Sequence, residues 1–258
     1  MTTERGTDLA DRPLEDIVAE AQRIVERASA RSVPVKLVGG LAIRLHSSEP
    51  PRSSLTRQFK DIDLVTPRSG SREAASFIVS LGYAADETFN AMNAGRRALF
   101  YDVEHRRQLD VFVGSFEMCH VVPIADRWDV DSGAIPLAEL LLTKLQIVEL
   151  NEKDLTDILA LLVEHEVGDH DADTVNAAFM AKLCADDWGL WRTCKMNIER
   201  ARNALERFDL SGEDRRVLAD RLDSLWSRIE AAPKSRRWKL RDRIGDKKRW
   251  YEEPEEVG

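Results

Sequence analysis

The 258-residue sequence has no apolar run long enough to cross a membrane, and residues 1–16 lack the apolar core of a signal peptide. Its three cysteines are odd in number and irregularly spaced, which is typical of reduced thiols and not of a disulfide framework: Cys119, Cys184 and Cys194. There is no internal repeat and no low-complexity tract. These absences predict a cytoplasmic protein with no membrane partner.

The sequence also lacks any Cys-x-x-Cys or His-x-x-x-His pair, so it does not predict a zinc site. The formal net charge of −8 argues against nonspecific nucleic-acid binding by the protein as a whole. Charged residues make up 33% and hydrophobic residues 43%, proportions typical of a globular protein with one large domain or two small ones.

The most informative segment that is present covers residues 35–65. A short apolar strand at 35–38 runs into Gly39-Gly40, and a helix-like segment follows at once. Glycines after a strand allow a tight turn and let a ligand approach the backbone closely. The helix that begins there offers unpaired N–H groups and the positive end of its dipole to an anion. This half of the segment is typical of a phosphate-binding turn.

The second half of the segment carries two aspartates, Asp61 and Asp63, on a predicted strand. Side chains two residues apart on a strand point to the same face, so the two carboxylates project together while Ile62 and Leu64 face the core. Paired carboxylates repel each other unless a cation lies between them, and Mg²⁺ prefers such oxygen ligands.

Each half has an ordinary structural explanation. A lone Gly-Gly after a strand is most often a turn, and a lone Asp-x-Asp is most often an exposed strand end. The order of strand, Gly-Gly, helix, basic loop and Asp-x-Asp strand is more specific than either part, and it favours a nucleotide and metal site.

This order resembles the nucleotidyltransferase fold, or DNA polymerase β-like, superfamily. A third acid on a later strand completes that pattern, and Asp110 in the alternating segment 107–113 matches it. The resemblance implies that Asp61, Asp63 and Asp110 hold two Mg²⁺ ions, with Mn²⁺ as an alternative. One departure is Gly40, which stands where other members carry a serine hydroxyl.

Residues 137–162 resemble the helical signature of AbiEii-type and MenT-like toxin nucleotidyltransferases. The matching positions are Lys144, then Lys153, Asp154 and Asp157. Lys144 lies in an apolar run, where a lysine is unusual unless it is paired or points into a cleft. The leucines around it are simply a helical core stripe. Asp154 is equally consistent with an ordinary acid in the first turn of a helix.

The two resemblances together imply a set of site residues. The catalytic set is Asp61, Asp63, Asp110, Lys144 and Asp157. The nucleotide-binding set is Gly39, Gly40, Arg57, Lys60, Lys144 and Asp154. The implied reaction moves a nucleoside monophosphate from an NTP such as ATP to an acceptor hydroxyl.

Three functions remain open. The toxin resemblance implies a transferase that acts on the 3′ end of tRNA or on a protein and has a cognate antitoxin. Aminoglycoside and lincosamide nucleotidyltransferases share the same motif layout, so a small antibiotic is an alternative acceptor. The third alternative is a non-catalytic nucleotide-binding module.

A basic segment near the C-terminus supports an RNA partner. Residues 233–250 contain nine lysines and arginines against two aspartates, with Trp238 and Trp250 interleaved. Such a segment can neutralise phosphates and stack on bases. The alternative is a solvated helix that docks Trp238 and Leu240 on the core.

Hydrophobic periodicity predicts an α/β (α+β) fold with a small mixed sheet and a helical C-terminal region. Helices are expected over residues 14–30, 41–47, 72–81, 137–150, 154–164, 172–185, 187–208 and 212–229. Strands are expected at 35–38, 61–66, 97–103 and 108–113, and near 83–89. The expected domains are an N-terminal helix at 1–34 packing on the core, a nucleotidyltransferase core at 35–165, and a helical region with a basic tail at 166–258. Residues 47–59 are expected to form a basic flap.

Overall fold

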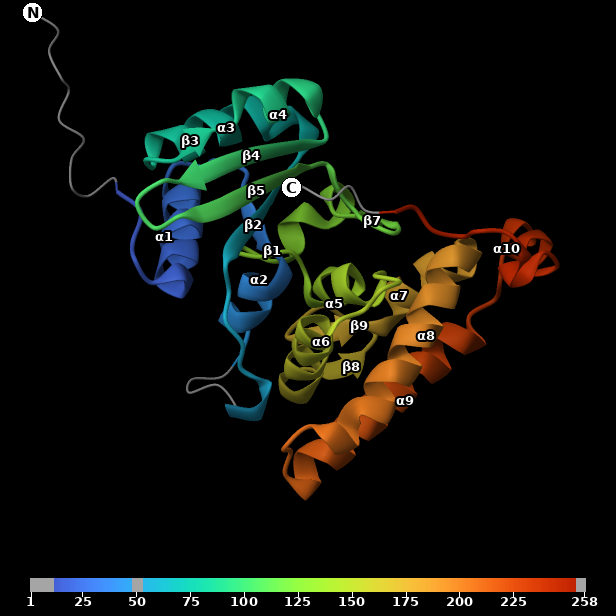
Figure 1. The fold of residues 1–258 in the computed structure, drawn as a ribbon. Helices are drawn as coiled ribbons and strands as arrows, with labels where there is room; N and C mark the ends of the chain where they lie inside the picture. Colours follow the sequence, from blue (N-terminus) through green and yellow to red (C-terminus); the bar gives the residue numbers. More distant parts are fainter. Residues whose placement is uncertain (1–11, 48–52, 254–258) are drawn as a thin grey trace, which may run out of the picture. The chain divides into compact units, whose positions relative to one another are not determined.

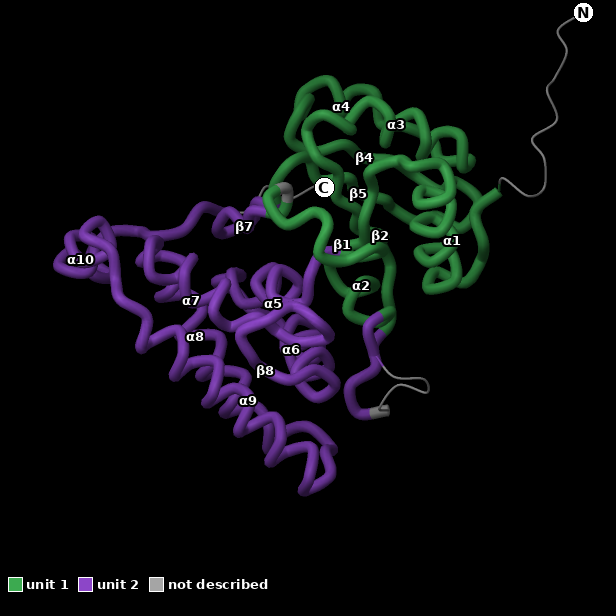
Figure 2. The backbone as a smooth tube through the Cα atoms, turned by 180° about the vertical axis from the view of Figure 1, so that it is seen from behind, with its two compact units in different colours: residues 1–45, 58–115, 124–134 green, residues 46–57, 116–123, 135–258 purple. Residues whose placement is uncertain are grey.

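The computed structural model describes residues 12–47 and 53–253, and the chain forms two compact units. Unit 1 comprises Met1–Leu45, Gln58–Ser115 and Ile124–Ala134, and unit 2 comprises His46–Arg57, Phe116–Pro123 and Ile135–Gly258 (Figure 2). Residues 48–52 of the expected flap lie outside the described residues. The predicted domain boundaries at 34 and 165 stay a prediction, and the compact units divide the chain at other positions.

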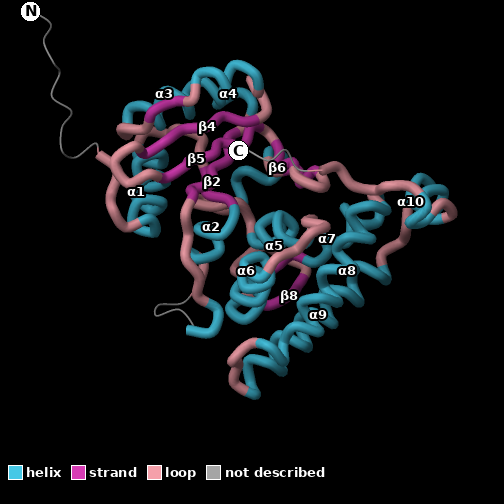
Figure 3. Tube along the Cα trace, viewed as in Figure 1, coloured by secondary structure: helices cyan, strands magenta, loops and turns pink. Residues whose placement is uncertain are grey.

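Unit 1 is built on a five-stranded mixed sheet with the order β1-β2-β5-β4-β3 (Figures 1 and 3). The strands are β1 Lys36–Val38, β2 Asp61–Thr66, β3 Ala84–Ala85, β4 Arg97–Asp102 and β5 Arg107–Val113. Only the β2–β5 pair is parallel, and β1–β2, β4–β5 and β3–β4 are antiparallel. The mixed α/β class that the sequence predicts is therefore confirmed.

Helices complete unit 1. They are α1 Ile17–Ala30, α2 Gly39–Leu45, α3 Ser71–Ser80 and α4 Glu87–Met92. Asp16 caps α1 because its side chain accepts a hydrogen bond from the N–H of Ala19. The core is formed by apolar side chains from the strands and helices, among them Ile24, Leu37, Ile62, Leu64, Ile78 and Leu109. Gly82 follows Leu81, the C-cap of α3, and has φ +94°, a left-handed conformation that is common in glycine just after a helix.

Unit 2 is mainly helical. Its helices are α5 Leu137–Leu145, α6 Glu152–Glu164, α7 Ala177–Asp186, α8 Trp188–Ala204, α9 Gly212–Ala231 and α10 Arg236–Asp242. Two small sheets accompany them, β6 Ser115–Glu117 with β7 Val121–Pro123, and β8 Glu166–Gly168 with β9 Thr174–Asn176. Ser211 caps α9, because its hydroxyl oxygen accepts from the N–H of Asp214.

The tryptophans of unit 2 anchor its helices. The Trp191 ring centroid lies 6.2 Å from Trp188, 5.8 Å from Trp226 and 5.0 Å from Trp238. Trp188 in turn contacts Trp250 at 6.1 Å. This connected set of rings ties α8, α9, α10 and the C-terminal segment into one packed cluster.

Three predicted elements are wrong in part. The expected strand near 83–89 is the short β3 followed by α4, because the Asp86 side chain accepts from the N–H of Phe89 and caps a helix there. The helix expected over 172–185 begins only at Ala177, after β9, where the side chain of Asn176 is the cap. The helix expected to reach residue 150 ends at Leu145.

Among the described residues, no helix is long and apolar enough to span a membrane.

Candidate functional site

The turn between β1 and α2 is shaped by Gly39. Its φ is +72°, in the left-handed region that glycine adopts without strain. A Cβ at this position would lie 2.6 Å from Oδ2 of Asp63, which is closer than real contacts allow. Gly39 and Gly40 are both buried, so the turn brings the backbone directly against the Asp63 carboxylate. The sequence-predicted glycine turn and the second aspartate therefore meet.

The three predicted carboxylates of unit 1 lie on one face of two neighbouring strands. Asp61 and Asp63 alternate along β2 with Ile62 and Leu64, which are fully buried on the other face. In the parallel β2–β5 pair, Asp63 is the register partner of Asp110. The burial of the acids differs, because Asp61 is exposed, Asp63 is half-buried and Asp110 is buried.

Asp110 already has two side-chain partners. Nε of Arg97 donates to its Oδ1 at 2.7 Å, and Nε2 of Gln108 donates to its Oδ2 at 2.7 Å. Arg97 comes from β4, and its guanidinium carbon also lies 5.1 Å from the ring centroid of Phe112 and 5.8 Å from that of Phe89. Sequence reasoning missed Arg97 because its contact depends on strand pairing across the sheet, which no local motif reports.

The carboxylates of unit 1 fit a divalent cation in part. Asp61 and Asp63 supply the hard oxygen donors that Mg²⁺ prefers, on one face of one strand. The oxygens of Asp110 are instead bonded to Arg97 and Gln108. Within residues 12–47 and 53–253, no group of three or more histidines, cysteines, aspartates or glutamates is gathered closely enough to hold a metal ion.

The remaining predicted charges, apart from Lys60, form a separate network in unit 2. Nε and Nη2 of Arg57 donate to the two carboxylate oxygens of Asp157 at 2.7 and 2.9 Å. Nζ of Lys144 lies 2.9 Å from Oδ2 of Asp157 and donates to Oδ1 of Asp154 at 3.1 Å. Asp154 also completes a capping box with Asn151 at the start of α6. Two cations and two carboxylates therefore balance each other.

Burial and charge act against each other on the pKa values of this network. Burial lowers the pKa of Lys144, but the adjacent carboxylates of Asp157 and Asp154 outweigh burial and leave the pKa above its ordinary value of 10.5. Burial raises the pKa of Asp157, but Lys144 and Arg57 outweigh that effect and leave it below its ordinary value of 3.8. Lys144 and Asp157 are therefore both charged at neutral pH.

Lys60, the other predicted nucleotide ligand, directly precedes β2 in unit 1 and is exposed. The structure thus groups the sequence-predicted residues into two sets. Gly39, Gly40, Lys60 and the three metal-site aspartates belong to unit 1, while Arg57, Lys144, Asp154 and Asp157 belong to unit 2.

The basic C-terminal segment carries more exposed bases than acids. Both of its acids are exposed and bond to side chains of α8, because Asp242 accepts from Nε1 of Trp188 at 2.7 Å and Asp246 accepts from Nε and Nη2 of Arg192, each at 3.0 Å. The alternative explanation of the segment, a helix docked on the core, holds for Trp238, which is buried, but is wrong for Leu240, which is 61% exposed. The exposed bases of the segment are Arg236, Arg237, Lys239, Arg243, Lys247, Lys248 and Arg249.

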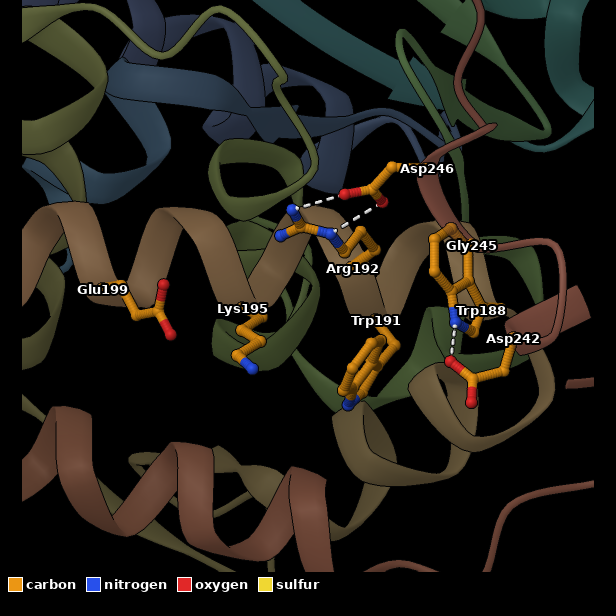
Figure 4. Close-up of a pocket in the computed structure, with 8 residues that line it drawn as sticks. All are labelled: Trp188, Trp191, Arg192, Lys195, Glu199, Asp242, Gly245 and Asp246. Atoms are coloured by element: carbon orange, nitrogen blue, oxygen red, sulfur yellow. Dashed lines mark hydrogen bonds and ion pairs between the residues drawn. The ribbon is translucent and has the colours of Figure 1, made fainter. Parts of the chain in front are cut away.

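A hollow of about 440 Å³ lies between α8 and this segment (Figure 4). Trp191 and Lys195 point to one side of α8 in Figure 4, while Arg192 points to the other side and binds Asp246. None of the sequence-predicted site residues lines this hollow. Its aromatic lining belongs to the tryptophan cluster that fixes the C-terminal segment.

No family model matches this sequence, and no curated protein matches it. Two solved structures of ANT(2″)-Ia are similar to it. One is a solution structure described as an antibiotic-resistance factor, with a TM-score of 0.41 and 17% identity, covering 65% of this chain and 93% of that chain. The other is a crystal structure in complex with adenylyl-2″-tobramycin, with a TM-score of 0.40 and 17% identity, covering 64% of this chain and 98% of that chain. Identities this low leave the activity and substrate to be argued from this chain's own residues.

Proposed function

We propose that the protein is a Mg²⁺-dependent nucleotidyltransferase that moves a nucleoside monophosphate from an NTP to an acceptor hydroxyl. The observation that carries this proposal is the arrangement in unit 1, where Gly39 lies against Asp63 and Asp63 is in register with Asp110. A tight turn and two neighbouring strands place the three carboxylates on one face of the sheet. A purely structural role does not require a glycine pressed against a carboxylate.

The reaction is a single displacement at phosphorus. The acceptor oxygen attacks the α-phosphorus, the bond to the bridging oxygen of the β-phosphate breaks, and pyrophosphate leaves. Asp110 takes the proton of the acceptor hydroxyl. Fixed positions and fixed charges supply most of the acceleration in such reactions.

Asp61 and Asp63 would hold the divalent cation, with Asp110 as the third carboxylate of the set. When bound, Mg²⁺ or Mn²⁺ neutralises charge that develops on the phosphate oxygens. In unit 1, the proposed contacts to the nucleotide are the backbone N–H groups of Gly39 and Gly40 and the side chain of Lys60. For Arg57 and Lys144 of unit 2, a phosphate contact stays a prediction from the resemblance. Asp154 and Asp157 would orient the last two cations.

The acceptor that we favour is the 3′ end of RNA such as tRNA, as in a toxin-type enzyme with a cognate antitoxin that works in the cytoplasm. The exposed bases of the C-terminal segment support this choice, because they outnumber its two acids, each of which is bonded to a side chain of α8. A protein side chain is a second macromolecular acceptor. An aminoglycoside or lincosamide antibiotic is the alternative, and it would make no use of this basic surface.

The test is incubation of the purified protein with each labelled NTP and Mg²⁺, against total RNA, protein extract and an antibiotic panel. We expect label transfer and stoichiometric pyrophosphate release with one acceptor class. Asp61→Asn and Asp63→Asn should abolish transfer and leave the metal-free fold as stable as before or slightly more stable, because clustered carboxylates repel one another.

The controls separate catalysis from binding. Nucleotide binding without transfer to any acceptor would identify a non-catalytic nucleotide-binding module instead. Full activity of Asp63→Asn at saturating Mg²⁺ would contradict the metal assignment.

A further inference from the structure

Arg97 lies on the same face of the unit 1 sheet as the three aspartates. It is the register partner of Phe112 across β4 and β5, and Phe112 is two residues beyond Asp110 on β5. Asp110 is in turn the partner of Asp63 on β2. Residues two apart on a strand, and residues opposite each other on neighbouring strands, point to the same face. Arg97 is therefore a cation on the face that carries the carboxylates.

The guanidinium of Arg97 is held in one orientation by three groups. Its Nε donates to Oδ1 of Asp110 at 2.7 Å, and its central carbon lies 5.1 Å from the ring centroid of Phe112 and 5.8 Å from that of Phe89. Nε2 of Gln108 donates to Oδ2 of Asp110 at 2.7 Å and so fixes the carboxylate itself. An ionised carboxylate has about four lone-pair sites, so these two bonds leave Asp110 with capacity for further partners. An arginine oriented in this way loses little side-chain entropy when it binds a ligand.

Most of the N–H donors of Arg97 are not used by the protein. An arginine has five such donors, and Asp110 accepts the one on Nε. The donors on Nη1 and Nη2 have no acceptor among the described residues. The side chain is 21% exposed and neither terminal nitrogen is buried, so these donors can reach solvent or a ligand. Their planar arrangement fits the oxygens of a phosphate.

We propose that Arg97 is a further phosphate-binding residue of unit 1, whose terminal N–H groups bind a phosphate oxygen of the substrate. This inference rests on the proposed function, which supplies two sources of phosphate, the triphosphate of the nucleotide and the backbone of an RNA acceptor. A phosphate that approaches this face also meets the carboxylates of Asp61 and Asp63, which repel it. A cation fixed beside them offsets part of that repulsion.

The experiment measures the binding of inorganic triphosphate to the full-length protein by isothermal titration calorimetry at a fixed concentration of Mg²⁺. Arg97→Met should bind triphosphate about ten- to a hundredfold more weakly than the wild type, the range expected for loss of a charge-assisted hydrogen bond. Arg97→Lys keeps the charge and loses the planar fork, so its affinity should be intermediate. Arg96→Met is the matched control, because Arg96 is the exposed neighbour in the chain, and it should bind like the wild type.

A second pair of variants separates phosphate binding from the structural role of the Arg97–Asp110 ion pair. Arg97→Met alone leaves a buried carboxylate without its cation and can fail to fold, whereas Arg97→Met/Asp110→Asn removes both charges. The double variant should fold, as checked by circular dichroism. It should still bind triphosphate about ten- to a hundredfold more weakly than Asp110→Asn. Equal affinities of the double variant and Asp110→Asn for triphosphate and for RNA would show that Arg97 acts only as the counter-ion of Asp110, and would overturn the inference.

A parallel titration with single-stranded RNA, without nucleotide, identifies the source of the phosphate. Weaker binding of triphosphate in the Arg97 variants assigns the contact to the nucleotide, and weaker binding of RNA alone assigns it to the acceptor. Unchanged binding of both probes, or no detectable binding of either probe by the wild type, overturns the inference.

Failure of this inference differs from failure of the proposed function. If the wild type transfers nucleotide while the double variant binds both probes as tightly as Asp110→Asn, only the role of Arg97 is wrong. If the Arg97 variants lose phosphate binding but the wild type transfers nucleotide to no acceptor, the phosphate contact stands and the transferase proposal falls.

Discussion

At the scale of single residues, Gly39 links the backbone conformation of the turn to the position of a carboxylate. Two separate effects oppose a side chain there, the positive φ and the approach of Asp63. Gly95 has a similar φ of +81°, but a Cβ there would meet nothing within 4 Å. Comparing substitutions at the two glycines therefore distinguishes the cost of the left-handed backbone conformation from the cost of steric contact with Asp63.

We predict that Gly39→Ala destabilises the protein more than Gly95→Ala. Gly95→Ala should cost about 1–2 kcal/mol for the left-handed conformation alone. Gly39→Ala should cost roughly a further 1–3 kcal/mol because the new methyl group displaces the Asp63 carboxylate. Urea unfolding of both variants measures the difference. Equal decreases in the free energy of unfolding would show that the Asp63 side chain moves aside without an energetic cost.

Lys144 is the residue for which the sequence left two explanations, a phosphate contact or a paired core-edge lysine. It binds both Asp154 and Asp157 and is 12% exposed, so pairing is established while phosphate contact stays a prediction. Lys144→Met should lower the free energy of unfolding by about 2–3 kcal/mol, below the full loss of a buried pair, since Arg57 still holds Asp157.

Nucleotide titration of Lys144→Met tests whether Lys144 also contacts phosphate. A phosphate contact predicts affinity about ten- to a hundredfold weaker in Lys144→Met. Lys182→Met, which changes an exposed lysine on α7, serves as the control and should keep both stability and affinity. Lower stability with full affinity would make Lys144 a structural residue only.

Asp157 leads to a prediction of how the stability of the protein changes at acidic pH. Its pKa is lower in the folded protein than the ordinary value of 3.8, so the unfolded chain binds its proton more readily. The stabilisation is therefore fully present above that value and is lost as the pH falls through the folded pKa. Unfolding free energy measured from pH 6 downward should fall less steeply in Asp157→Asn than in the wild type. Parallel curves would show that Asp157 contributes nothing to acid sensitivity.

At the scale of elements, α10 shows how a short helix becomes a fixed basic surface. Its N-terminus is capped by Ser235, Trp238 is buried against Trp191, and Arg241 donates to the carbonyls of Gly245 and Lys248. The buried side of the segment is thus held by specific contacts, and most of its bases point into water. An ordered array of cations is what a phosphate backbone binds.

We predict that charge removal on α10 and the residue after it weakens RNA binding more than nucleotide binding. In Arg236→Gln/Arg237→Gln/Arg243→Gln, the slope of log affinity against log salt should flatten by about 0.7 for each phosphate of single-stranded RNA that the variant no longer neutralises. Arg216→Gln on the exposed surface of α9 is the control. Identical slopes in the triple variant and the wild type would show that these three arginines do not contact RNA phosphates.

The sequence predicts those elements whose ends are set by local signals. The bounds of β2 are the predicted ones, because the Asp-x-Asp pair opens the strand and Pro67 follows Thr66 directly. The end of α5 could not be predicted, since it is fixed by distant contacts. Nδ2 of Asn197 donates to the carbonyls of Leu145 and Ile147, and the N–H of Val148 donates to Sγ of Cys119.

The candidate site follows the same rule. Gly39 and Asp63 could be singled out from turn chemistry and strand periodicity, which are local, whereas Asp110 is expected from the superfamily resemblance. Strand register places Asp63 beside Asp110, and the role of all three residues stays a prediction. Arg97 could not be predicted, since only the antiparallel β4–β5 pairing brings it to Asp110. The Arg57–Asp157 bond likewise joins residues 100 positions apart.

At the scale of the whole molecule, each unit is assembled from separated stretches of chain. The backbone passes between units after residues 45, 57, 115, 123 and 134. In unit 1 the last stretch is essential to the first, because the N–H of Leu37 on β1 donates to the carbonyl of Gly133, and Leu37 pairs with Ala134. The three domains expected from the sequence, by contrast, are each a continuous stretch.

This interleaving has a consequence for protein synthesis. During translation, β1 can form its backbone contacts with residues 133 and 134 only after those residues have left the ribosome, long after β1 itself has been made. Residues 46–57 and 116–123 wait still longer, until the helices that complete unit 2 are translated. Neither unit can be obtained by a single cut in the gene, and isolating unit 1 requires bridging two excised segments with linkers.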